Sequence, residues 1–300
     1  MYQLDVTKRL VILAAMLMST VLVWVMPVLS SGDLDLSALG IEAFGQPSDV
    51  LAVTFLDIGQ GDSILIETPD GVQLLIDGGP DGTVLRRLAH ELPLFDRTID
   101  IILGTHPDKD HIGGLVDVLK RYKVGKIITT ENTGETMVAS SFQKGLVQEG
   151  AEIVMARAGQ VYQLGASTTL TILAPKNNPA MLESNTASIV AKLSYGDIDF
   201  ILTGDAPISI EEYLVEAYGE TLSSEVLKLG HHGSKTSSSD VFLDTVKPRY
   251  AVVSAGKDNS YGHPHQSVVD AVQARNIKMV STAEEGSITF MTNGVDVWIR

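Results

Sequence analysis

A dense group of histidine and aspartate residues at 105–114 restricts the possible folds of this chain more than any other feature of its sequence. The segment reads Thr-His-Pro-Asp-Lys-Asp-His-Ile-Gly-Gly, and its candidate ligands are His106, Asp108, Asp110 and His111. It follows an apolar strand predicted at 99–105 and precedes an amphipathic helix predicted at 112–122. A strand-to-helix loop can direct alternate side chains into one pocket, and imidazole and carboxylate groups bind Zn²⁺ or Mn²⁺. The pattern therefore predicts an α/β fold with a metal site where a strand ends.

The spacing of these ligands suggests two metal ions. His106 and Asp108 can face one ion, while Asp110 and His111 turn toward a second ion nearby. The chain has no cysteine, so any metal must be held by imidazole and oxygen ligands. The alternative is a surface turn in which Asp108 or Asp110 caps the following helix.

The order of apolar segments predicts two mixed sheets with helices outside. An antiparallel meander at 51–79 opens the domain, because Asp70-Gly71 separates two alternating apolar runs. Strands and helices then alternate to residue 156, a strand-rich block covers 161–204, and strands and helices alternate again before a predicted closing hairpin at 278–299.

Two further groups of candidate ligands follow predicted strands in the second half. Asp205 ends the strand at 199–203, where it can bridge two cations or cap the helix opened by Pro207. His231 and His232 are adjacent, so they must point in different directions. We predict His231 as a ligand and His232 as a ligand or proton donor.

Six ordered motifs resemble the metallo-β-lactamase superfamily: FLDIGQGDSILI (55–66), LLIDGG (74–79), HPDKDHIGG (106–114), ILTGD (201–205), LKLGHHGSKTSS (227–238) and YGHPH (261–265). Asp108 stands where most of that superfamily has histidine. This variant is similar to the hydrolase domain of ComEC-type competence proteins and to phosphorylcholine esterases. The resemblance implies a four-layer αββα sandwich, two divalent ions (Zn²⁺ or Mn²⁺), Asp205 as a ligand and at least one ligand from the histidine pair.

The superfamily usually supplies another histidine before the aspartate of the ILTGD motif, but residues 112–230 contain none. Asn185 occupies that region and is a weaker oxygen ligand. The remaining candidates are supporting or substrate-binding residues: Asp77, Gln60, Asp62, Lys235 and His263.

The resemblance implies hydrolysis of a phosphodiester, with DNA as the expected substrate. Asp110 or Asp205 would accept a proton from the attacking water, and His232 is the third catalytic candidate. Two alternatives are a hydrolase of small phosphodiesters or phosphorylcholine-bearing polymers, and a DNA-guiding module without catalysis.

The net charge of −15 argues against a surface that binds nucleic acid everywhere. Phosphate contacts must therefore be local. We expect a basic rim around the site from cations close to the motifs: Lys109, Lys228, Lys235, Lys247, Arg249 and Lys257.

An uncharged apolar run at 10–29 predicts an N-terminal membrane anchor over residues 1–30. Lys8 and Arg9 precede the run, which orients the rest of the chain to the extracytoplasmic side. A cleaved signal peptide is the alternative. Residues 31–49 are expected to be a linker and residues 50–300 the hydrolase domain, with a separate channel protein as its partner in DNA uptake.

Overall fold

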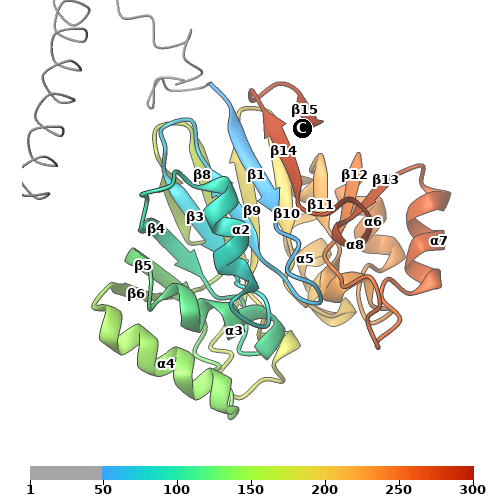
Figure 1. Cartoon of the computed structure of the whole chain (residues 1–300). Coiled ribbons are helices and arrows are strands. Elements are labelled where there is room, and N and C mark those ends of the chain that lie inside the picture. Colours follow the sequence, from blue (N-terminus) through green and yellow to red (C-terminus); the bar gives the residue numbers. More distant parts are fainter. Residues whose placement is uncertain (1–48) are drawn as a thin grey trace, which may run out of the picture. The chain divides into compact units, whose positions relative to one another are not determined.

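The opening meander forms as the alternation of apolar residues predicts. In the computed structural model, which describes residues 49–300, the first strands are β1 (Leu51–Phe55), β2 (Ile64–Glu67) and β3 (Gln73–Ile76) (Figure 1). They pair antiparallel, and the turn at Asp70-Gly71 joins β2 to β3. Strands β4 (Thr98–Leu103), β5 (Lys123–Thr129) and β6 (Glu152–Met155) then continue the sheet in parallel.

Parallel strands need crossover connections, and helices supply them. The three crossovers of the first sheet carry α2 (Thr83–Glu91), α3 (Lys109–Val118) and α4 (Met137–Glu149). Helix α3 begins three residues before the predicted start at residue 112, so Asp110 and His111 lie in its first turn.

The second sheet has seven strands in the order β13-β12-β11-β10-β9-β8-β7. Its antiparallel part is β7 (Val161–Leu164), β8 (Thr168–Ala174), β9 (Val190–Tyr195) and β10 (Ile198–Leu202). Its parallel part continues from β10 to β11 (Val226–Lys228), β12 (Tyr250–Val253) and β13 (Lys278–Ser281). Helices α5 (Ile208–Tyr218), α6 (Asp240–Val246) and α7 (Gln266–Ala274) connect these parallel strands, and short 3₁₀ turns lie at Asn185–Ala187, Gly219–Leu222 and Gly230–Gly233.

The predicted hairpin at 278–299 is wrong for its first strand, residues 278–281. Strand β13 pairs in parallel with β12 in the second sheet, and α8 (Thr282–Glu285) then leads the chain to the first sheet. Only β14 (Ile288–Thr292) and β15 (Val297–Ile299) form a hairpin, and β14 lies beside β1. The Asn293-Gly294 pair between them is the usual signal for such a tight turn, and no comparable signal follows Ser281.

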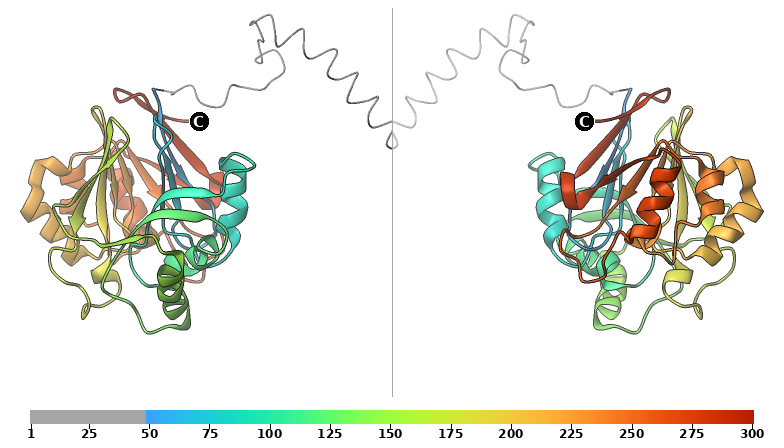
Figure 2. Two further views of the ribbon diagram at one scale, coloured as in Figure 1. Left: turned by 90° about the vertical axis from the view of Figure 1, so that its left-hand side faces the viewer. Right: turned by 90° about the vertical axis from the view of Figure 1, so that its right-hand side faces the viewer.

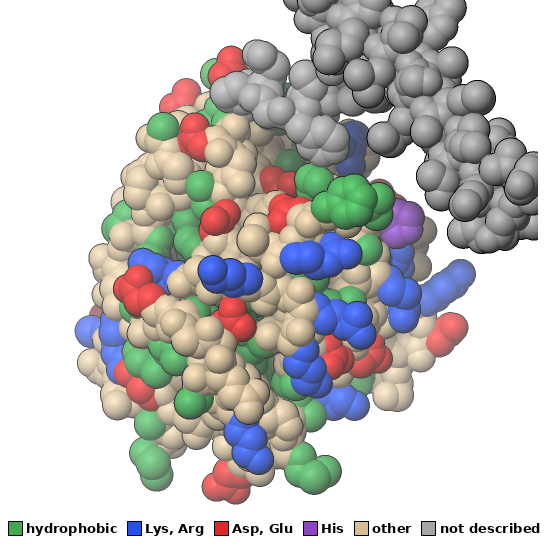
Figure 3. All heavy atoms as spheres, turned by 60° about the vertical axis from the view of Figure 1, so that its left-hand side comes forward, with side chains coloured by type: hydrophobic (Ala, Val, Ile, Leu, Met, Phe, Trp, Pro, Cys, Tyr) green, Lys and Arg blue, Asp and Glu red, His purple; other side chains and the backbone are tan. Residues whose placement is uncertain are grey.

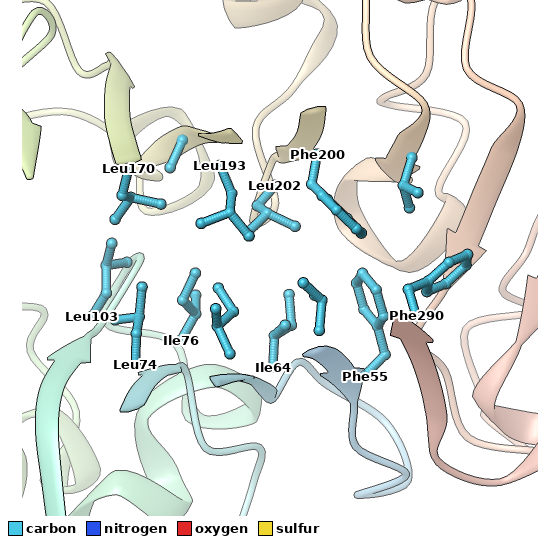
Figure 4. Packing of buried hydrophobic residues seen from close by; sticks show 14 of the residues in the cluster. Phe55, Ile64, Leu74, Ile76, Leu103, Leu170, Leu193, Phe200, Leu202 and Phe290 are labelled. Atoms are coloured by element: carbon cyan, nitrogen blue, oxygen red, sulfur yellow. The ribbon is translucent and has the colours of Figure 1, made fainter. Parts of the chain in front are cut away.

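The two sheets pack face to face, and helices cover their outer faces (Figure 2). Alternation along each strand explains both layers: Leu74 points into the core between the sheets, whereas Leu75 packs against the helices of the first sheet. Figure 4 shows Phe55 and Phe290 of the first sheet facing Phe200 of the second, with ring centroids of Phe200 and Phe290 6.2 Å apart. The predicted α/β class with two mixed sheets is confirmed.

The predicted anchor at 1–30 and almost all of the predicted linker lie outside the described residues. Among residues 49–300, no helix has the length and apolar character needed to cross a bilayer.

Candidate metal centre

The first sheet supplies one side of the site from the ends of β3 and β4. Asp77 follows β3, and His106 follows β4 with Asp108 at the N-cap position of α3. The Asp108 side chain makes no capping hydrogen bond, so the predicted surface-cap alternative does not describe it. Helix α3 reaches this position because Gly114 lets it touch the loop after β3; a methyl group there would overlap the Gly78 carbonyl oxygen.

The second sheet supplies the other side from the ends of β10 and β11. Asp205 is buried and does not cap α5, whose N-cap is Pro207. His231 and His232 both adopt left-handed backbone conformations, with φ of 49° and 56°. This conformation is unfavourable for residues other than glycine, and it turns the two imidazoles in different directions.

Three buried imidazoles direct Nε2 into the site, because Nδ1 of each ring faces an oxygen on the other side. The Nδ1 atom of His111 lies 2.7 Å from Asp77 Oδ2, that of His106 lies 3.0 Å from Thr105 Oγ1, and that of His232 lies 2.9 Å from the Ser254 carbonyl oxygen. Each of these oxygens can accept a hydrogen bond from Nδ1–H, which leaves Nε2 free to bind a ligand. Within residues 49–300, all three Nε2 atoms are buried and have no hydrogen-bond partner.

Asp205 lies where these nitrogens converge. Its carboxylate oxygens are 3.3 Å from His111 Nε2, 3.4 Å from His232 Nε2 and 4.0 Å from His106 Nε2. His231 Nε2 lies 3.7 Å from the same carboxylate, farther than His232 Nε2, and its side chain is 28% exposed whereas that of His232 is buried. Of the histidine pair, His232 is therefore the better placed ligand, although we predicted His231 from the sequence.

Asp110 and Asp108 complete the oxygen donors from the first half. Asp110 Oδ2 lies 3.4 Å from His232 Nε2, and Asp108 Oδ2 lies 3.7 Å from His106 Nε2. The two aspartates thus approach different imidazoles, in agreement with the spacing argument. Ser184 donates a hydrogen bond to Asp108 Oδ1 at 2.6 Å, which brings the segment before Asn185 against the site.

Asn185 lies in the region where the superfamily usually has an additional histidine. Its Nδ2 atom is 3.4 Å from His231 Nδ1, and its Oδ1 atom is buried without a partner in the described part of the chain. An oxygen donor is therefore available beside His231.

Asp77 and Asp62 face Nδ1 atoms and support the imidazoles. Asp77 accepts hydrogen bonds from the Thr105 backbone N–H and hydroxyl as well as facing His111. Asp62 belongs to a buried group with His111, Asp205 and His232 whose ligand atoms lie within 4.8 Å of one another. Its Oδ2 is 2.6 Å from Lys228 Nζ and its Oδ1 is 3.3 Å from His232 Nδ1, so it is better placed to orient His232 than to bind metal.

Lys228 was predicted to lie in the exposed basic rim, and this prediction is wrong. Its side chain is fully buried at the end of β11, and its ammonium group also donates a hydrogen bond to the Gly204 carbonyl oxygen at 3.2 Å. It is therefore an internal cation and not part of an exposed rim. A lysine inside the short, fully buried strand β11 was the signal that could have revealed this role.

Two other members of the expected basic rim also lie elsewhere. Lys247 and Arg249 precede β12, at the end of the second sheet opposite the site, and Lys247 pairs with Glu220 at 3.3 Å. Lys109, Lys235 and Lys257 are exposed on segments that carry site residues. Figure 3 shows that Lys and Arg side chains, mixed with acidic groups, lie on one face of the domain.

The charges of the site shift the pKa values of its histidines in opposite directions. Burial and the neighbouring His111 lower the pKa of His106 to about 4. Burial also disfavours the charged form of His232, but Asp205, Asp110 and Asp62 outweigh it and raise the pKa of His232 to about 9. Asp205 and Asp77 likewise raise the pKa of His111 against the effect of burial.

The mouth of the site is a small pocket of about 150 Å³. It is lined by Gln60, Asp108, Asp110, Asp205, His231, His232, Tyr261 and His263. Gln60 also accepts a hydrogen bond from the Gly256 N–H at 3.3 Å, which joins the loop after β1 to the loop after β12.

The histidines of the segment 261–265 lie beside this pocket. Burial and the neighbouring His232 and His231 lower the pKa of His263 to about 4. Lys235 is exposed beside this region, and its backbone N–H donates to His265 Nδ1 at 3.2 Å.

The donor set fits a transition-metal ion. Nε2 atoms from three histidines and oxygens from three aspartates surround one space, and the buried nitrogens lack partners that they would otherwise require. The structure therefore contains a buried His/Asp group able to bind metal. The fold brings the predicted ligands together from segments more than a hundred residues apart.

Comparisons with known proteins agree with this geometry. The family model of the Metallo-beta-lactamase superfamily matches residues 56–257. The metallo-beta-lactamase fold protein YhfI from Bacillus subtilis has a similar fold, with a TM-score of 0.54 and 13% identity over 84% of this chain and 100% of that protein.

Two curated relatives are competence proteins. Competence protein ComA of Neisseria gonorrhoeae is 36% identical over 248 residues, covering 81% of this chain and 33% of the relative. ComE operon protein 3 of Bacillus subtilis (strain 168) is 30% identical over 257 residues, covering 79% of this chain and 32% of the relative. The chain thus spans about a third of the length of these relatives.

Proposed function

The chain belongs to the metallo-beta-lactamase superfamily, and we propose on this basis that it is a metal-dependent phosphodiesterase that cleaves DNA during DNA uptake. The observation that carries the hydrolase proposal is the convergence of three partnerless Nε2 atoms on Asp205. The competence relatives support DNA as the substrate.

We propose two ions, Zn²⁺ or Mn²⁺, held in two overlapping groups of ligands. His106, Asp108 and Asp205 would hold one. Asp110, His111, His232 and Asp205 would hold the other, with Asp205 between them. His231 and Asn185 are further donors on the first side.

Bound ions would supply an activated water and would stabilise negative charge on a phosphodiester. The chain's own residues supply the rest. Asp110 is partly exposed at the mouth, so it is placed to accept a proton from the attacking water, whereas Asp205 is enclosed. His263 lies at the same mouth, and its lowered pKa leaves it neutral at pH 7. Its Nδ1 has no partner among the described residues, so it can accept a hydrogen bond from a substrate when Nε2 carries the proton.

We also propose that the predicted anchor at 1–30 holds this domain on the extracytoplasmic side of the membrane. Support comes from the apolar run at 10–29 and the preceding Lys8 and Arg9. A separate membrane channel would then take up the strand that the domain leaves intact.

Metal analysis and DNA cleavage test the function together. The purified chain should contain Zn or Mn, and it should cleave labelled DNA until a chelator is added. His111→Ala should abolish both properties, whereas His90→Ala, which alters an exposed histidine on α2, should change neither. A chain that binds DNA but takes up no metal would favour the non-catalytic alternative.

A further inference from the structure

We propose that Tyr261 is a stacking subsite for an unpaired nucleobase, so that the site acts on single-stranded nucleic acid. This inference rests on the proposed function and extends it, because it names the form of the substrate. It follows from the placement of one exposed ring, the loop that holds it, and the size of the pocket beside it.

Tyr261 presents an aromatic face at the mouth of the metal centre. The residue is 64% exposed, yet it lines the same pocket as Asp110 and His232. One side of the ring stacks on His263, with centroids 5.7 Å apart and planes inclined by 22°. Among residues 49–300, no other ring packs on Tyr261, and we infer from the exposure of the residue that its other face is open to a ligand.

The ring is not held in place by core packing or by its hydroxyl group. It belongs to none of the three hydrophobic clusters, and its hydroxyl makes no hydrogen bond among residues 49–300. A single exposed aromatic side chain is common on protein surfaces and by itself indicates no ligand. Tyr261, however, lines the same pocket as Asp110 and His232, so a substrate bound at the metal centre would meet its ring.

The loop that carries Tyr261 is closed by Asn259. The Asn259 side chain donates to the carbonyl oxygens of Gly256 and His263, at 2.9 and 2.7 Å, and accepts the His263 N–H at 2.9 Å. These bonds bracket Tyr261 on both sides. The backbone that carries the ring is therefore held before a ligand arrives, which lowers the entropic cost of stacking.

The pocket is too small to hold more than one group of a polymeric substrate. Its volume is about 150 Å³, below the roughly 300–1,000 Å³ typical of pockets that enclose a whole small ligand. A single phosphodiester group can enter, while the attached nucleosides must lie on the rim. Among the described residues that line this pocket, Tyr261 is the one tyrosine, phenylalanine or tryptophan, so an adjacent base would meet its open face.

An open aromatic face selects for an unpaired base. Bases inside a duplex are covered on both faces by their neighbours, whereas those of a single strand can stack on a side chain. The exposed Lys235 and Lys257, on segments next to His232 and Tyr261, add attraction to phosphates that does not depend on sequence.

Binding of metal-free protein tests the subsite separately from catalysis. In chelator, fluorescence anisotropy should be measured with a short oligothymidylate, with an abasic oligonucleotide of equal length, and with a closed hairpin duplex. The full chain should bind oligothymidylate about 5- to 100-fold more tightly than the abasic strand, which is the range expected for one stacked base. Tyr261→Ala should remove this preference without weakening binding to the abasic strand, and Tyr261→Phe should retain it.

Phe95→Ala is the matched control, because Phe95 is 90% exposed in the loop before β4 and lies outside the pocket. It should behave like the parent. The proposal is overturned if the parent binds both strands equally, if Tyr261→Ala keeps the preference, or if the hairpin duplex binds best. If the metal-loaded parent cleaves DNA but the metal-free parent shows no preference for bases, the stacking subsite is refuted and the hydrolase proposal stands. If the preference depends on Tyr261 but no cleavage occurs, the hydrolase proposal is refuted and the subsite stands.

Discussion

At the scale of single residues, the site depends on what holds the far side of each imidazole. His106, His111 and His232 each have Nδ1 against an oxygen, which fixes the ring orientation and leaves Nε2 for a ligand. Substitution of a residue that supplies one of these oxygens should therefore weaken metal binding although no ligand is removed.

Asp77→Asn should weaken metal binding by about 10- to 100-fold, because it removes the anionic acceptor of His111 Nδ1 without removing a ligand. Isothermal titration with Mn²⁺ or Zn²⁺ measures the effect. Asp244→Asn, which alters an exposed aspartate paired with Arg275, is the control. Equal affinity in Asp77→Asn and the parent would mean that Asp77 does not support the ligand.

Metal binding should release protons and strengthen as pH rises. The raised pKa values of His232, to about 9, and His111 mean that both imidazoles are protonated in the metal-free site at neutral pH. A metal ion must displace those protons, so affinity should increase about tenfold per pH unit for each proton displaced, from about pH 6 to about pH 8. Titration in buffers of different ionisation enthalpy counts the protons, and an affinity independent of pH would contradict the prediction.

Lys228→Met should destabilise the metal-free protein by roughly 3–5 kcal/mol, because it removes the cation nearest to the buried Asp62 carboxylate, at 2.6 Å. Chemical denaturation in chelator measures the free energy of unfolding. Lys228→Met combined with Asp62→Asn should recover part of the loss, since no buried charge then remains unpaired. Lys247→Met, at an exposed ion pair, should change little.

The sequence was sufficient to nominate the residues of the site but not their roles. His106, Asp110, His111 and Asp205 could be found because each follows a strand with a recognisable pattern. The difference between His231 and His232 could not, because it depends on left-handed backbone angles that only the surrounding fold imposes. Lys228 was misplaced because a lysine is usually exposed.

At the scale of elements, the position of α3 decides whether Asp110 and His111 reach the site. The helix packs its first turns on the loop after β3, and the His111 carbonyl accepts the Gly78 N–H at 2.7 Å. This contact needs Gly114, as its neighbour across the interface is a carbonyl oxygen.

Gly114→Ala should therefore destabilise the fold by about 1–3 kcal/mol and weaken metal binding at the same time, because α3 must move away from the loop. Thermal unfolding and metal titration measure the two effects. Gly82→Ala should be milder, because a methyl group there meets side chains alone, Asp117 Oδ2 at 3.3 Å and Leu85 Cδ1 at 4.0 Å. Similar behaviour of the two variants would count against a tight contact at Gly114.

Helices and strands were predicted best where the spacing of the hydrophobic residues and the positions of the turn residues indicate the same boundaries. The meander at 51–79 and the alternation of strands and helices follow from local signals. Strand β13 could not be assigned in the same way, because pairing with β12 or with β14 is a choice between sheets that a local apolar run does not encode.

At the scale of the whole molecule, the metal centre lies where the two sheets meet, and neither sheet holds it alone. Asp205 and His232 come from the second sheet, whereas His106 and His111 come from the first. A bound ion would therefore hold the two halves of the sandwich together.

Metal should stabilise the whole domain as one unit. Free ion at 100 times its dissociation constant should add about 2.7 kcal/mol to the free energy of unfolding, provided that the unfolded chain does not bind it. Calorimetry in chelator and in Mn²⁺ or Zn²⁺ should show a single transition that moves to higher temperature. His111→Ala should show no such movement, and two separate transitions would contradict a shared site.

The place of β14 beside β1 has a consequence for how the polypeptide matures. Thr54 and Thr289 share a hydrogen bond across 235 positions of sequence, so β1 can pair with β14 only after the segment of β14 has been synthesised. Until the ribosome has released that segment, β1 has an open edge able to pair with other nascent chains. The first sheet can therefore close only after nearly all of its own strands have left the ribosome.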